Sequence, residues 1–283
     1  MNASGEHPES ASQGGERTIA VTGGGSGLGA AIARRFGRAG YRVAVIDIDA
    51  ARASEILALI EAQGGEGFAF EMDVNNPSDW AALDHRVMTE WGGLEVLVNN
   101  AGVAAWGRLE ESTLDDWQWV LDTDLFSVVR GCHQFLPQMR KQRRGHVVNM
   151  ASFAGMIAVP QGSAYATAKA GVVALSNQLR VDLAGSGVGI SVVCPAFVRT
   201  RLLDSFRSRD EGVARQVKRW MEHSGVTADD VAERVFKAVQ SGRFLVLTHF
   251  DTRLWWRIVR WFPNLTHRLL VRMAGKRKLG GRS

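Results

Sequence analysis

Three residues in the second half of the chain have the types and the spacing for proton transfer. Tyr165 and Lys169 stand four positions apart, and Ser152 lies upstream of them. Four positions make about one helical turn, which would place the phenol and the ammonium on one face. A phenol by itself titrates near pH ~10, and a neighbouring ammonium favours its ionised form. Ser152 is then suited to hydrogen-bond a substrate oxygen while Tyr165 moves the proton.

A Tyr–Lys pair at this spacing is most often a surface feature when it occurs alone. A glycine-rich motif near the N-terminus favours a functional interpretation of the pair. Residues 18–21 are apolar and precede TGGGSGLG at 22–29, which opens a helical pattern that extends to Phe36. Strand, glycine turn and helix form a phosphate site, since the backbone can approach a pyrophosphate at the helix N-terminus. The alternative is an ordinary glycine turn.

Asp47 ends the next apolar run, residues 42–47. A carboxylate there accepts hydrogen bonds from a ribose 2′-hydroxyl and repels a 2′-phosphate. No Arg or Lys stands at Ser26 or directly after Asp47, so the pattern favours NAD over NADP. The alternative role for Asp47 is to cap the following helix, a role that Asp49 is also placed to take.

Apolar runs alternate with helical patterns along the rest of the chain. The expected strands cover residues 67–72, 94–98, 146–150, 190–194 and 244–248. The expected helices cover 51–63, 77–91 and 114–143, and a further helix contains Tyr165 and runs to about 184. This alternation predicts an α/β fold with a doubly wound parallel sheet, helices on both faces and ligands at the C-terminal strand ends. Residues 17–250 would form one domain.

The motifs follow one another in the order of a known family. They are TGGGSGLG at 22–29, Asp73-Val74, NNAG at 99–102, Ser152, YATAK at 165–169 and PAFVRT at 195–200. Over about residues 17–250 the chain resembles the short-chain dehydrogenase/reductase family. The resemblance implies a Rossmann-type single domain, binding of NAD(H) or NADP(H), interconversion of alcohols and carbonyls, and a homo-oligomer, either a dimer or a tetramer.

The resemblance also implies roles for individual residues. The expected catalytic set is Ser152, Tyr165, Lys169 and Asp124. The expected cofactor contacts are Thr22, Gly23, Ser26, Gly27, Leu28, Gly29, Asp47, Ile48, Asp73, Val74, Asn100, Ala101, Gly102, Tyr165, Lys169, Pro195, Val198 and Thr200. No metal ligand set is expected.

Two positions depart from the family pattern. Ala196 replaces the usual Gly after Pro195, a small change. Asp124 stands where the family has an Asn that positions a water linking the Lys to solvent. Because Asp is acceptor-only, and negative when ionised, Asp124 puts the proton relay in question.

The expected substrate site is apolar. The loop of residues 153–160 and a lid at 200–224 contribute mainly apolar side chains. The expected substrate contacts are Phe153, Met156, Phe197, Leu202, Leu203 and Phe206. These predict a bulky hydrophobic small molecule, such as a steroid, a terpene or an aromatic ketone.

Composition sets the remaining limits. Residues 1–16 are rich in Ser, Gly and Glu and are predicted to be disordered. There is no run of eighteen apolar residues for a spanning helix. Cys132 and Cys194 both read as small core residues, which favours a reducing, cytoplasmic setting.

The last segment, residues 251–283, is a basic amphipathic extension. Residues 253–283 contain nine Lys and Arg and no acid, and the whole chain carries +5, so residues 1–252 carry −4. A mildly acidic body does not predict a nucleic-acid partner. Pro263 should divide the extension into two helices, which either pack on a neighbouring subunit or the lid, or make peripheral contact with an anionic membrane.

The sequence therefore predicts an NAD-dependent oxidoreductase that interconverts an apolar secondary alcohol and its ketone. The alternative is a catalytically idle NAD-binding module whose extension recruits a partner or a membrane.

Overall fold

The computed structural model describes residues 17–198, 206–208, 212, 215, 219 and 221–279. Thr200, Leu202, Leu203 and the predicted disordered segment 1–16 lie outside these residues. The side chains of 250, 251 and 273–279 are likewise not described.

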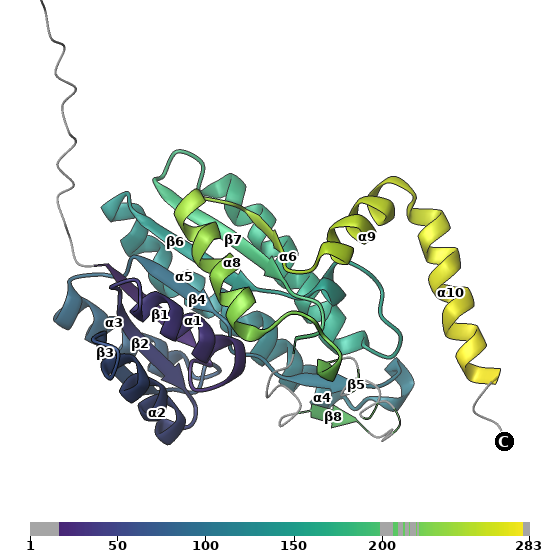
Figure 1. The fold of residues 1–283 in the computed structure, drawn as a ribbon, viewed down its shortest axis with the longest axis horizontal. Coiled ribbons are helices and arrows are strands. Elements are labelled where there is room, and N and C mark those ends of the chain that lie inside the picture. Colours follow the sequence, from purple (N-terminus) through teal and green to yellow (C-terminus); the bar gives the residue numbers. More distant parts are fainter. Residues whose placement is uncertain are drawn as a thin grey trace, which may run out of the picture.

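Seven parallel strands form the central sheet in the order β3-β2-β1-β4-β6-β7-β9 (Figure 1). They are β1 (Thr18–Thr22), β2 (Arg42–Asp47), β3 (Glu66–Glu71), β4 (Val96–Asn99), β6 (Gly145–Met150), β7 (Val188–Cys194) and β9 (Leu245–Leu247). The chain leaves β1 in one direction to β2 and returns to its other side at β4. This reversal opens a crevice at the C-terminal ends of β1 and β4, and the predicted Rossmann-type doubly wound sheet is confirmed.

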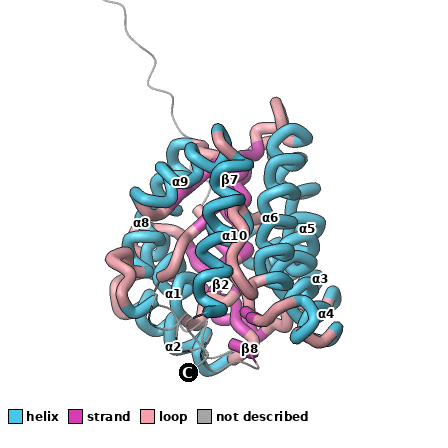
Figure 2. Tube along the Cα trace, turned by 90° about the vertical axis from the view of Figure 1, so that its right-hand side faces the viewer, coloured by secondary structure: helices cyan, strands magenta, loops and turns pink. Residues whose placement is uncertain are grey.

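The central strands are apolar on both faces because helices cover both. Ile19 pairs with Val43 on one side and with Val96 on the other, and all three are fully buried. Helices α1 (Gly27–Gly37), α2 (Ala50–Glu61) and α8 (Ala228–Ser241) lie on one face, and α3 (Pro77–Trp91), α5 (Ser127–Gln142) and α6 (Ser163–Asp182) lie on the other. Figure 2 shows the strands between these two helical layers.

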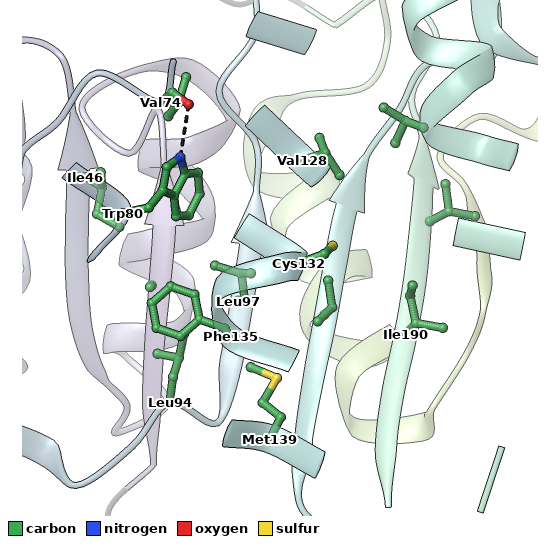
Figure 3. Packing of buried hydrophobic residues seen from close by; sticks show 14 of the residues in the cluster. Ile46, Val74, Trp80, Leu94, Leu97, Val128, Cys132, Phe135, Met139 and Ile190 are labelled. Carbon is green, nitrogen blue, oxygen red and sulfur yellow. Dashed lines mark hydrogen bonds between the residues drawn. The ribbon is translucent and has the colours of Figure 1, made fainter. Parts of the chain in front are cut away.

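The core beneath α3 and α5 ties the sheet to a loop at the crevice. Trp80 and Phe135 are buried there, with Met139 below them (Figure 3). The indole Nε1 of Trp80 donates to the Val74 carbonyl oxygen at 3.0 Å. This bond holds the loop after β3 in place at the edge of the crevice.

The helix predicted over 114–143 is present, but it is not α-helical throughout. It consists of α4 (Leu114–Leu121), a π turn η2 (Asp122–Phe126) and then α5. The π turn contains Asp124, whose side chain is drawn inward to polar partners that belong to other elements. Apolar periodicity carries no signal for such a widening, which occurs often at functional sites.

The structure also contains a short two-stranded sheet that the sequence did not predict. Strand β5 (Ala104–Trp106) pairs in parallel with β8 (Phe206–Ser208). This ladder brings residues that are about a hundred positions apart together beside the crevice.

The C-terminal extension forms α9 (Phe250–Trp261) and α10 (Pro263–Leu279), so the predicted break is confirmed. Proline disfavours helical geometry at the residue before it, and Phe262 has φ −131° and ψ 58°. Pro263 then starts α10, where its missing N–H costs nothing. None of the helices in the described part of the chain is both long and apolar enough to cross a bilayer.

Candidate active site

A cleft of about 630 Å³ lies at the C-terminal ends of the central strands. Thirteen of the predicted cofactor residues line it: Gly23, Ser26, Gly27, Leu28, Asp47, Ile48, Asp73, Val74, Asn100, Ala101, Gly102, Tyr165 and Lys169. Asp124 lines it as well. The tertiary fold therefore gathers most of the scattered motifs into one site.

The glycine loop has the geometry that its sequence predicted. Gly23 has φ +61°, which glycine adopts without strain. A Cβ on Gly29 would collide with the Gly23 carbonyl oxygen, so α1 starts close against the loop. Thr22 does not line the cleft; its hydroxyl accepts from the amides of Asn100 and Ala101 at 2.9 and 3.0 Å. It thus joins the loops after β1 and β4.

Asp47 is buried and its carboxylate is held by backbone amides. The carboxylate accepts from the Gly25 amide at 3.0 Å and from the Asp49 amide at 3.1 Å. The Asp49 side chain caps α2 by accepting from the Arg52 amide. The predicted cap at Asp49 is confirmed, and the ribose contact of Asp47 stays a prediction.

Arg52 was missed by the sequence analysis. Its guanidinium lies 3.6 Å from the Asp47 carboxylate and 2.8 Å from that of Asp49, and it lines the cleft. No cation follows Asp47 directly in the sequence, but the first turn of α2 brings Arg52 back to it. A cation therefore lies beside Asp47 in the fold, although none follows it directly in the sequence.

Tyr165 and Lys169 share one face of α6, as their spacing predicted. Both are buried, and the Lys169 Nζ lies 5.8 Å from the centre of the Tyr165 ring. The same Nζ donates to the Met150 carbonyl oxygen at 3.3 Å and lies 3.2 Å from the Asp124 Oδ2. The ammonium is thus fixed between β6, the π turn and the phenol.

Asp124 is fully buried, with 0% of its surface exposed. Its Oδ1 accepts from the Val103 amide at 2.7 Å while its Oδ2 faces Lys169. A Cβ on Gly102 would lie 3.2 Å from Oδ1 and 3.3 Å from the Lys169 Nζ, so the backbone after β4 passes close to this pair. The predicted catalytic Asp therefore contacts the predicted catalytic Lys directly.

Burial dominates the pKa of Tyr165 and raises it; the Lys169 ammonium opposes this rise and the Asp124 carboxylate adds to it. Burial lowers the pKa of Lys169, but the charges of Asp124 and Tyr165 outweigh it and the pKa is raised overall. Burial raises the pKa of Asp124 against the opposing effect of Lys169. The expected lowering by Lys169 is present, but the expected net direction for Tyr165 is wrong.

Ser152 is oriented by the turn that follows β6. Its Oγ accepts from the Ala154 amide at 3.1 Å and donates to the Pro195 carbonyl oxygen at 3.5 Å. The second bond is long, so the hydroxyl can turn from Pro195 to a stronger acceptor. The Ser152 hydroxyl also acts to lower the pKa of Tyr165.

An apolar cluster surrounds Tyr165. Trp106 lies with its ring centre 5.7 Å from that of Tyr165, and Phe206 stacks on Trp106 at 6.3 Å. The other members of this cluster are Ala104, Ala154, Val159, Phe197 and Met221. Of the predicted substrate contacts, it contains Phe197 and Phe206.

Trp106 was missed, although the apolar run directly after NNAG was a usable signal. Phe153 instead belongs to the main core, and Met156 packs against that core. Val198 is buried in the core on the opposite face, and the Pro195 carbonyl oxygen accepts from the Phe153 amide at 2.8 Å. Phe153, Met156 and Val198 therefore pack in or against the core next to the site.

Comparison with known proteins finds short-chain dehydrogenases. The family model described as short chain dehydrogenase matches residues 17–211. The chain is 33% identical to 2-(S)-hydroxypropyl-CoM dehydrogenase 3 of Xanthobacter autotrophicus, over 77% of this chain and 87% of that protein. It is 31% identical to EphD of Mycobacterium tuberculosis over 80% of this chain, but it spans only 40% of the length of that relative.

Solved structures agree. A short chain dehydrogenase/reductase from Burkholderia phymatum in complex with NAD superposes with a TM-score of 0.84 and 32% identity, covering 89% of this chain and 95% of the other. A metagenomic short-chain oxidoreductase in complex with NADP superposes with a TM-score of 0.68 and 28% identity, covering 82% and 94%. Similar structures thus bind either nicotinamide dinucleotide.

Proposed function

The chain belongs to the short-chain dehydrogenase family, and we propose that it is an NAD-dependent oxidoreductase that interconverts an apolar secondary alcohol and its ketone. One observation carries the proposal. The glycine loop, Asp47, Tyr165 and Lys169 line a single cleft, and an apolar cluster adjoins Tyr165.

The residues of the cleft fit a nicotinamide dinucleotide. Gly23 and Gly102 leave the backbone bare where a Cβ would crowd Asn100 or the Asp124–Lys169 pair. The N-terminus of α1 favours a pyrophosphate, and the Asp47 carboxylate suits ribose hydroxyls. Asp47 supports NAD over NADP, because it would repel a 2′-phosphate.

When bound, the cofactor supplies the hydride acceptor or donor. The chain's own residues handle the proton. Tyr165 exchanges a proton with the substrate oxygen, and the Ser152 hydroxyl donates a hydrogen bond to the same oxygen. Lys169 stabilises the phenolate, since its ammonium acts to lower the pKa of Tyr165. Asp124 holds that ammonium in position.

The apolar cluster supports a bulky hydrophobic substrate. Trp106, Phe197 and Phe206 place aromatic rings in the described apolar cluster that includes Tyr165, and such a lining favours a hydrophobic substrate. The proposed substrates are steroid, terpene or aromatic secondary alcohols and the matching ketones.

Assembly and location complete the proposal. Leu114 in α4 is 86% exposed, and Phe126 in the π turn and Val129 in α5 are also exposed. Exposed apolar side chains of this kind support contact with a second copy, in a homodimer or a homotetramer. Sedimentation equilibrium would measure the assembly. Cys132 and Cys194 are free and buried, which supports a reducing, cytoplasmic setting.

A screen of hydrophobic secondary alcohols with NAD and NADP, followed by absorbance of the reduced cofactor, tests the function. We expect turnover with NAD that rises with the apolar size of the alcohol. Dinucleotide binding without turnover of any alcohol or ketone would contradict the proposal and favour the idle-module alternative.

A further inference from the structure

The two C-terminal helices form an arm that stands apart from the helical layers. We define the arm as residues 250–279, which comprise α9 and α10. Helix α9 packs on β9, while the main packing partner of α10 is α9. Figure 1 shows α10 extending away from the helical layers. Among the described elements, only α9 has more than a weak packing contact with α10.

The arm concentrates exposed apolar side chains. Fifteen large apolar residues are exposed in the described part of the chain, and seven of them fall between Leu254 and Val271. Trp261 is 77% exposed, Phe262 59% and Leu254 55%. A cluster of this kind marks an interaction surface, unlike apolar residues scattered singly.

On α9 the apolar and basic residues form neighbouring stripes. Leu254 and Trp261 are seven positions apart, which is nearly two helical turns, so they lie on the same face of α9. Ile258 lies between them on that face. The arginines at 253, 257 and 260 repeat the same spacing on the adjoining face. On α10, exposed Leu265 and Leu269 alternate with Arg268 and Arg272, with a weaker separation of the faces.

A basic pocket adjoins the arginine stripe. It has a volume of about 350 Å³, and the residues that line it are Arg234, Lys237, Arg243, Leu245, Val246, Leu247, Arg253, Trp256 and Arg257. Five of these side chains are cationic and none is acidic. Lys237 also pairs with Glu233 at 3.3 Å, and Arg234 interacts with Asp230, but neither acid lines the pocket. An anion in the pocket would therefore face a lining whose charged side chains are all cationic.

We propose that the arm lies on the surface of an anionic bilayer, and that the pocket beneath α9 binds the phosphate of a lipid headgroup. A helix with an aromatic and aliphatic stripe beside an arginine stripe lies in the plane of the interface, with the arginines at the level of the headgroups. Clustered basic residues draw such a segment to anionic lipid.

Charge favours the bilayer over a second copy of the chain. Residues 253–283 carry nine Lys and Arg and no acid. A two-fold interface would set the arm's own basic stripe against itself or near it, because the same patch is used on both copies. At an anionic membrane surface, the headgroups can bind the arginine stripe while the acyl chains contact the apolar stripe.

Cosedimentation of the full chain with vesicles tests the proposal. Vesicles of equal parts phosphatidylcholine and phosphatidylglycerol should pull down the protein, while vesicles of phosphatidylcholine alone should not. Added salt should weaken the binding to the anionic vesicles, because it screens exposed charges.

Three variants should weaken binding to the anionic vesicles. Arg253→Gln with Arg257→Gln should weaken it by roughly fivefold for each arginine, the scale for one basic residue near an anionic surface. Leu254→Ser with Trp261→Ser removes the apolar stripe. Arg243→Gln lies outside the arm and reports on the pocket alone.

Matched controls change similar exposed residues elsewhere. Arg38→Gln with Lys141→Gln removes two exposed charges, and Val181→Ser with Leu59→Ser removes two exposed apolar side chains. These should bind as the wild type does. Thermal unfolding of every variant verifies folding, and the salt dependence of the wild type needs no variant at all.

Failure of the wild type to bind anionic vesicles would overturn the proposal. So would arm variants that bind as well as their controls. A fall in oligomer mass in the arm variants, with no vesicle binding by the wild type, would assign the arm to a second copy and also reject the proposal.

Discussion

The Asp124 carboxylate lies 3.2 Å from the Lys169 ammonium, at the point where the helix after Thr113 widens into a π turn. The carboxylate pushes the pKa of Tyr165 upward, in the same direction as burial and against Lys169. The three groups are close enough to titrate as one coupled system. Their pH dependence therefore belongs to the set and not to any single residue.

Asp124→Asn keeps the side-chain shape and removes this charge. The ionisation that controls alcohol oxidation should move to lower pH, because the Tyr165 phenolate then forms with less repulsion. Activity should be retained. The measurement is the pH profile of kcat/KM for the alcohol at saturating NAD.

Asp122→Asn is the matched control, because Asp122 lies in the same π turn but is paired with Arg130. Its profile should coincide with that of the wild type. An unmoved profile for Asp124→Asn would show that the carboxylate has no influence on the proton transfer.

Tyr165→Phe removes the transferable proton and keeps the ring. The kcat should fall by at least ~10²-fold, the scale of general acid–base catalysis. Binding of the dinucleotide, followed by fluorescence of the reduced cofactor, should persist. Tyr41→Phe is the control, since Tyr41 is buried away from the cleft and only accepts a bond from Gln240. Comparable turnover in the two variants would refute the mechanism.

Asp47→Ser should relax the choice of cofactor. Loss of the carboxylate removes repulsion of a 2′-phosphate and frees Arg52 from an ion pair at 3.6 Å. We expect kcat/KM with NADP to rise by roughly 10-fold, since one charge interaction near a surface amounts to ~1–4 kcal/mol. Adding Arg52→Gln should reverse most of this gain. A wild-type enzyme that already prefers NADP would contradict the assignment of Asp47.

His146 should make the fold sensitive to acid. Burial lowers the pKa of His146 from 6.5 to about 4, and its Nε2 lies 2.8 Å from the Ser191 Oγ. Between pH 6.5 and about 4, His146 is protonated in the unfolded chain but neutral in the folded one. Its contribution to the free energy of unfolding is therefore fully present above pH 6.5 and is lost as the pH falls from 6.5 to about 4. At ~1.4 kcal/mol for each pKa unit, this loss is about 3 kcal/mol.

His146→Gln keeps a donor toward Ser191 and removes the titration. Its free energy of unfolding, measured with urea at several pH values, should fall less steeply below pH 6.5. His85→Gln changes an exposed histidine and should leave the slope as in the wild type. Equal slopes for wild type and His146→Gln would exclude His146 as the source.

Much of the architecture was predictable from the sequence because its determinants are local. Continuous apolar runs specify strands that are buried on both faces, and glycine, Asn and Asp at their ends specify the turns. The Thr227 cap of α8, the Asp49 cap of α2 and the break at Pro263 all follow from side chains within a few residues. The spacing of Tyr165 and Lys169 likewise determined their shared face.

The tertiary structure decided what depends on distant partners. Only the fold shows that Arg52 reaches Asp47 and that Trp106 and Phe206 meet beside Tyr165. Only the fold places Phe153 in the main core cluster. Only the fold shows that Asp124 lies in a π turn and is bound by Val103 and Lys169, which lie outside that turn. Burial, set by the whole domain, reversed the expected direction of the Tyr165 pKa, since desolvation outweighs one neighbouring charge.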